Sequence, residues 1–92
     1  MRRKREAVFD THIDLSVAKE ISSWTQEKRD EFLAFLEDFA EDPWRKADAK
    51  ATRSGIADYS WYTSATWKNI QVDFTIFDDG GFNVVTVNYI VT

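Results

Sequence analysis

The strongest candidate for chemistry in this chain is a polar segment, residues 44–55, which reads WRKADAKATRSG. Against the single carboxylate of Asp48 it holds four cations, namely Arg45, Lys46, Lys50 and Arg53. This local charge of +3 contrasts with residues 6–92 as a whole, where eight basic residues meet 16 acidic ones for a net charge of −8. Clustered cations attract anionic groups such as phosphates. Two interpretations stay open: a patch that faces an anionic target, and an ordinary solvated loop.

Few other groups in the chain are suited to catalysis. The absence of cysteine excludes disulfides, thiol catalysis and cysteine metal sites. The single histidine, His12, disfavours an imidazole-based metal site, and we interpret it as a surface or hydrogen-bonded strand residue. We therefore predict no metal and no cofactor. No apolar run has the length of a membrane span or of a signal-peptide core, so we expect a cytoplasmic protein without membrane contact.

Hydrophobic patterning predicts a flexible basic tail, residues 1–6, followed by a single α+β domain, residues 7–92. The tail is interpreted as solvated, with a nucleic-acid-binding arm as the alternative. Residues 7–13 (AVFDTHI) predict a short first strand, because they combine apolar and β-branched side chains.

Two helices are predicted after this strand. Asp14 or Ser16 can cap the first, which should end near Trp24 and place on one side the apolar residues Leu15, Val17, Ile21 and Trp24. Thr25 can cap the second, over residues 26–40, which Pro43 should close. The apolar stripe of this second helix comprises Phe32, Leu33, Phe35, Leu36 and Phe39.

Three successive strands are predicted in the last third of the chain, the first over residues 59–67 and the others on either side of an Asp-Asp-Gly-Gly turn. A type I′ turn centred on Asp79-Gly80 would pair residues whose numbers sum to 159. The resulting pairs are Phe74 with Val85, Val72 with Val87, and Ile70 with Tyr89, all on the core face. We expect the two-helix hairpin to cover the apolar face of this antiparallel meander.

The whole pattern resembles the RelE/ParE superfamily of bacterial toxins. The resemblance rests on the order strand, helix, helix and three strands, the helix end FAEDP, the aromatic strand YSW, and the hairpin segment VDFTIFDD, and it covers about residues 7–91. It implies the toxin of a type II toxin–antitoxin pair, which blocks translation by ribosome-dependent mRNA cleavage. The implied partners are a cognate antitoxin and the ribosome with its mRNA.

The resemblance also implies roles for individual residues. The cations Lys50, Arg53 and Lys68 would stabilise negative charge on the scissile phosphate, and Tyr89 would transfer a proton. The implied substrate-binding residues are Arg45 and Lys46.

Two other functions fit the same fold. The family's arginine in the penultimate strand corresponds to Gln71 here, and an acidic body disfavours binding to a phosphate backbone. A non-catalytic protein-binding module is therefore one alternative, and a gyrase-inhibiting toxin is the other. Exposed aromatics expected on the sheet face opposite the core could serve partner binding, namely Tyr62, Phe77 and Phe82.

Overall fold

In its described residues the chain forms a mixed sheet of five strands with helices on one face. A computed structural model describes residues 9–48, 51–55, 58–79 and 83–91. Its elements, in chain order, are β1 (Asp10–Ile13), α1 (Leu15–Ile21), α2 (Gln26–Glu41), α3 (Pro43–Lys46), β2 (Thr52–Arg53), β3 (Ser60–Trp67), β4 (Ile70–Asp78) and β5 (Asn83–Val91). The strand order is β1-β5-β4-β3-β2, with β1 parallel to β5 and the other neighbours antiparallel. The predicted α+β class and the antiparallel β3-β4-β5 meander are confirmed.

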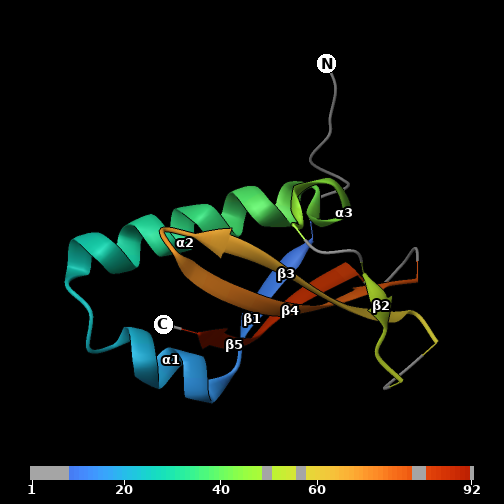
Figure 1. Cartoon of the computed structure of the whole chain (residues 1–92), viewed down its shortest axis with the longest axis horizontal. Helices are drawn as coiled ribbons and strands as arrows, with labels where there is room; N and C mark the ends of the chain where they lie inside the picture. Colours follow the sequence, from blue (N-terminus) through green and yellow to red (C-terminus); the bar gives the residue numbers. More distant parts are fainter. Residues whose placement is uncertain (1–8, 49–50, 56–57, 80–82, 92) are drawn as a thin grey trace.

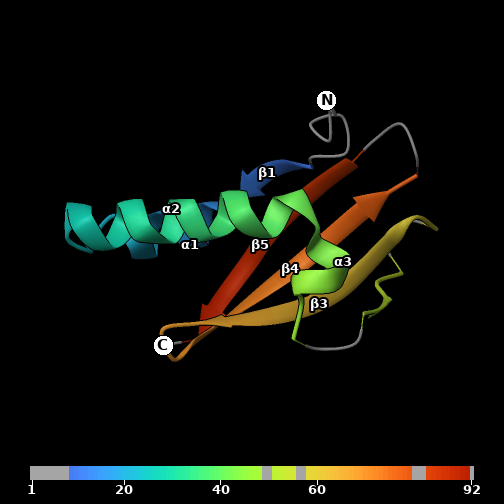
Figure 2. The same cartoon turned by 90° about the horizontal axis from the view of Figure 1, so that it is seen from above.

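Figure 1 shows the arrangement of α1, α2 and the sheet. Side chains from all three form one apolar core. Seen from above, α2 lies across the strands (Figure 2). The rings of Phe39 and Phe74 stack face to face at the centre of the core, with centroids 4.1 Å apart and planes 10° apart. The buried residues of this core are Phe9 and residues from α1 (Val17, Ile21), from α2 (Phe32, Leu36, Phe39, Ala40) and from the sheet (Ala65, Ile70, Val72, Phe74, Ile76, Val85, Val87, Ile90).

Side-chain caps begin both long helices. The Asp14 carboxylate accepts from the backbone N–H of Ser16, and the Thr25 hydroxyl accepts from that of Lys28. Asp14, not Ser16, is therefore the first cap, and Thr25 is confirmed as the second. The prediction that Leu15 belongs to the apolar side is wrong, because a helix turns about 100° per residue and Leu15 projects away from Val17.

The segment predicted as a plain loop contains two short elements. Pro43 ends α2, as predicted, but it also opens α3, since its fixed φ and missing N–H suit the first position of a helix. Strand β2 then pairs with Tyr62 and Trp61 of β3. Next along this edge, the backbone N–H of Asp48 donates to the Ser64 carbonyl.

The register of the β4–β5 hairpin differs from the predicted one by two residues. Asp78 pairs with Asn83, so four residues connect the strands instead of two. A two-residue shift preserves the facing, and Phe74 therefore meets Val87, not Val85, still inside the core. Gly80 and Phe82 lie outside the described residues.

A β-bulge interrupts the same hairpin between Asp73 and Phe74. Phe74 pairs with Val87 and Asp73 with Tyr89, which leaves Asn88 as the extra residue of β5. Beyond the bulge the facing of β5 is reversed, so Ile90 is buried while Tyr89 is 58% exposed. The prediction that Tyr89 lies on the core face opposite Ile70 is therefore wrong.

Candidate functional site

Three of the cations proposed for RNA binding or catalysis lie at one end of the molecule, on α3 and β2. The side chain of Arg45 forms an ion pair with Asp42 at 3.2 Å, and that of Lys46 pairs with Asp38 at 2.7 Å. Arg53 instead lies over the ring of Trp61, 5.6 Å from its centroid. Lys50 lies outside the described residues. Arg45 and Lys46, two of these three cations, thus already neighbour a carboxylate.

Lys68 lies at the opposite end of β3. With Asn69 it forms the two-residue turn between β3 and β4, in which both residues have positive φ, 49° and 66°. Its Nζ is 3.1 Å from a carboxylate oxygen of Glu31 on α2. Arg53 pairs with Trp61, and at about 3.3 Å per strand residue this position is roughly 23 Å from Lys68.

Tyr89 lies on the other face of the sheet. It pairs with Asp73 on the face opposite the helices, whereas Arg53 pairs with Trp61 on the helix-covered face. The described residues of the predicted catalytic set, Arg53, Lys68 and Tyr89, are thus distributed over two ends and two faces. They do not converge on one scissile phosphate.

Trp44, on α3, is a partly exposed tryptophan at the same end of the molecule as the basic residues. Trp44 meets the edge of Trp61 with ring centroids 5.2 Å apart. Its indole N–H donates to the Asp78 carboxylate at 2.9 Å. Both contacts fasten α3 to the sheet, so we assign Trp44 to the attachment of this helix.

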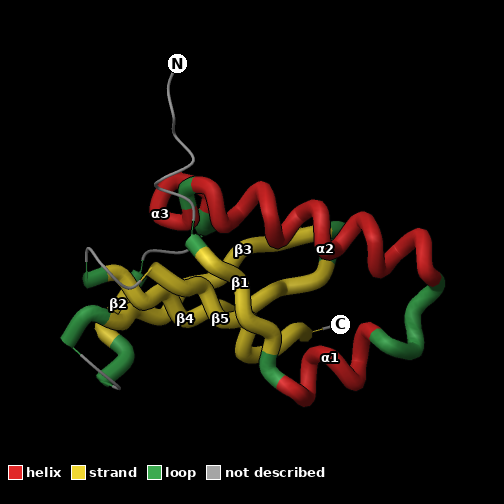
Figure 3. Tube along the Cα trace, turned by 180° about the vertical axis from the view of Figure 1, so that it is seen from behind, coloured by secondary structure: helices red, strands yellow, loops and turns green. Residues whose placement is uncertain are grey.

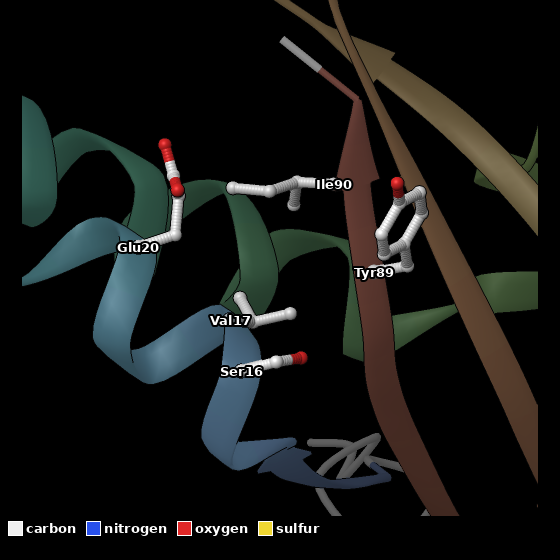
Figure 4. A pocket seen from close by; sticks show the side chains of 5 residues that line it. All are labelled: Ser16, Val17, Glu20, Tyr89 and Ile90. Carbon is white, nitrogen blue, oxygen red and sulfur yellow. The ribbon is translucent and has the colours of Figure 1, made fainter.

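A shallow hollow lies at the opposite end, between α1 and β5. Its volume is about 220 Å³, and it is lined by Ser16, Val17, Glu20, Tyr89 and Ile90. Figure 4 shows the side chains of Val17 and Ile90 extending into the space between α1 and β5. Sequence reasoning missed this hollow, because it depends on the bulge that turns Tyr89 outward.

The ends of β1 and β5 explain the position of the hollow. β1 pairs with β5 only as far as Ile13 opposite Val87, and the N–H of Asp14 donates to the Val87 carbonyl at 3.0 Å. The chain then leaves the sheet and enters α1 directly, as Figure 3 shows from behind. The last residues of β5 therefore lie beside α1 instead of beside a paired strand. The hollow is the space between α1 and these residues.

The hollow is bordered by negative charge. Hydrogen bonds from the hydroxyl and backbone N–H of Ser16 lower the pKa of the Asp14 carboxyl, which is ionised at neutral pH. Among the residues that the structure describes, the Glu20 carboxylate has no ion-pair partner. Asp73, opposite Tyr89 on β4, accepts a hydrogen bond from the side chain of Gln71.

Two kinds of feature are absent from the described residues. They contain no group of three or more histidine, cysteine, aspartate or glutamate residues that could hold a metal ion. None of their helices is long and apolar enough to span a membrane. Comparison of the whole chain with protein-family models, with curated proteins and with solved structures gives no match.

Proposed function

We propose that this chain is a protein-binding module that does not cleave RNA. The observation that carries the proposal is the separation of the cations and the proton donor expected for catalysis. Cleavage of a phosphodiester needs positive charge and a proton-transfer group around one phosphate. Here Arg53 and Lys68 stand roughly 23 Å apart along β3, and Tyr89 is on the other face of the sheet.

The surface supports binding of a protein in preference to a nucleic acid. With a net charge of −8, residues 6–92 repel a phosphate backbone. Several large apolar side chains are exposed, which favours a protein partner. The exposed set is Leu15, Leu33, Trp44, Tyr59, Tyr62, Tyr89 and Val91.

The second candidate is the toxin of a type II toxin–antitoxin pair that cleaves mRNA on the ribosome. The observation that favours it is the order of the main elements, a strand and two helices that precede the antiparallel β3-β4-β5 meander, with the short α3 and β2 between them; this order resembles the RelE/ParE superfamily. In that case the ribosome would have to supply the orientation and charge that Lys68 and Tyr89 lack here. A cognate antitoxin would then be the protein partner.

One experiment separates the two candidates. The chain is induced in bacteria without a partner, and mRNA ends at ribosomes are mapped alongside growth. If the chain is a binding module, no new mRNA ends appear after induction. In addition, the tagged chain isolated from its native cells carries a partner protein at a fixed stoichiometry, and the same complex forms again from the two purified proteins. Ribosome-positioned cuts that disappear in Tyr89→Phe would reject the binding module and support the interferase.

A further inference from the structure

We infer that the hollow between α1 and β5 is the docking site for a basic segment of a partner protein that inserts one apolar side chain. This inference rests on the proposed binding function and names its surface and the chemistry of its partner. We call this surface the α1–β5 hollow and define it by its lining residues, Ser16, Val17, Glu20, Tyr89 and Ile90.

The size of the hollow favours a single side chain over a metabolite. Its volume of about 220 Å³ lies below the roughly 300–1,000 Å³ of typical small-molecule pockets. Val17 and Ile90 contribute apolar surface, and the lining residues with polar side-chain groups are Ser16, Glu20 and Tyr89. The Ser16 hydroxyl already donates to the Asp14 carboxylate at 2.7 Å. Such a site suits one aliphatic or aromatic side chain, because it offers few hydrogen-bonding groups that could orient a polar ligand.

The most exposed apolar side chains belong to the two elements that form the hollow. The three most exposed large hydrophobic residues in the described part of the chain are Leu15 at 68%, Tyr89 at 58% and Val91 at 45%. All three belong to α1 or to the end of β5, the two elements that form the hollow. Tyrosine is enriched among residues that dominate binding energy at protein interfaces. The bulge therefore exposes a side chain of the kind that anchors partners.

Charge identifies the partner segment as basic. Glu20 lines the hollow without an ion-pair partner in the described residues, Asp14 is ionised at the start of α1, and Asp73 lies opposite Tyr89. Lys19 is the one cation within α1. A partner that carries lysine or arginine beside its apolar side chain meets complementary charge, whereas an acidic segment is repelled.

Fluorescence polarisation on the full chain tests the inference with three labelled peptides of equal length. The first peptide contains Lys and Leu, the second contains Lys and Ser, and the third contains Glu and Leu. The Lys/Leu peptide is expected to bind, and the other two are expected to bind at least about tenfold more weakly, since each lacks one of the two features. Failure of the Lys/Leu peptide to bind, or equal binding of the Lys/Ser peptide, would overturn the inference.

Matched variants locate the binding. Glu20→Lys and Tyr89→Ser should each weaken the Lys/Leu peptide by about tenfold. Glu37→Lys on α2 and Tyr62→Ser on β3 make the same chemical changes at exposed positions outside the hollow and should leave affinity within about twofold. Equal losses in Glu20→Lys and Glu37→Lys would show attraction to overall charge and reject the site.

Two further outcomes separate this inference from the proposed function. If the natural partner in the reconstituted complex binds Glu20→Lys and Tyr89→Ser as tightly as the parent chain, the site is wrong and the binding function stands. If the Lys/Leu peptide binds only after residues 1–6 are removed, the chain's own basic tail competes for the hollow, and the assignment to a partner protein is overturned.

Discussion

The bulge in β5 can be tested by comparing two adjacent residues, Tyr89 and Ile90. An uninterrupted ladder would place Tyr89 in the core and Ile90 outside, whereas the bulge at Asn88 does the reverse. Replacing each residue with alanine in separate variants therefore measures which of them is buried. Urea denaturation followed by circular dichroism gives the free energy of unfolding for both.

The expected magnitudes follow from burial. Ile→Ala in a core costs about 2–5 kcal/mol. Ile90 is 9% exposed and borders the hollow, so the low end, about 2 kcal/mol, applies. For a domain of this size that corresponds to a fall in Tm of about 8–16 °C. Tyr89→Ala removes a side chain that is 58% exposed and should cost less than about 1 kcal/mol.

The opposite ranking would refute the bulge. In an uninterrupted ladder Tyr89→Ala would empty a core site and cost about 3–5 kcal/mol, as loss of a buried aromatic side chain does. The urea m-value serves as the control, because a change in m would indicate altered compactness and make the two free energies incomparable.

Three shorter predictions concern other parts of the fold. Val87→Asp should abolish cooperative thermal unfolding, because it buries an unpaired charge where Val87 is fully buried; a retained transition would contradict this placement. Asp14→Asn keeps the helix cap but removes the charge that Ser16 stabilises. Since the folded pKa of Asp14 is lowered from 3.8, its contribution to stability is present above pH 3.8 and is lost as pH falls below it, so the parent chain should be more stable than the variant above that pH and the difference should vanish in acid; a difference that persists at low pH would contradict this. Trp44→Phe should retain ring packing but lose the hydrogen bond to Asp78, which lowers stability by about 1 kcal/mol; an unchanged urea midpoint would show that this bond contributes nothing.

The helices could be predicted from sequence because their signals are local. Thr25 caps α2 through its own side chain, and Phe32, Leu36 and Phe39 repeat at the helical period and are buried. Asp14 caps α1 in the same way. Each of these signals lies within a few residues of the structure that it specifies.

The hairpin register could not be predicted with equal success, for a physical reason. Alternation has a period of two, so a shift of two residues preserves every facing and cannot be detected from the pattern. The bulge leaves only a weak sequence signal, because Asn88 is a single strand-disfavouring residue within a run of strand-forming ones. Its side chain donates to the hydroxyl of Thr75, a long-range contact that becomes visible only once the strands are paired.

Elements α3 and β2 were missed because they are short. Four residues and two residues are too few to show a period, and both elements depend on tertiary contacts. Packing of Trp44 on Trp61 holds α3, and pairing with β3 holds β2.

The basic loop also shows that the net charge assigned to a segment depends on where the segment is taken to begin and end. Residues 44–55 carry a local charge of +3, but the carboxylates that pair with Arg45 and Lys46 belong to Asp42 and Asp38, just before this segment. Exposed ion pairs are weak, so these contacts alone would not prevent anion binding. They do reduce the excess of positive charge at this end. The α1–β5 hollow presents the reverse pattern, with Glu20 unpaired among the described residues beside exposed apolar side chains. A partner that binds there must therefore supply the cations itself, which is why the charge of the probe peptide is the decisive variable.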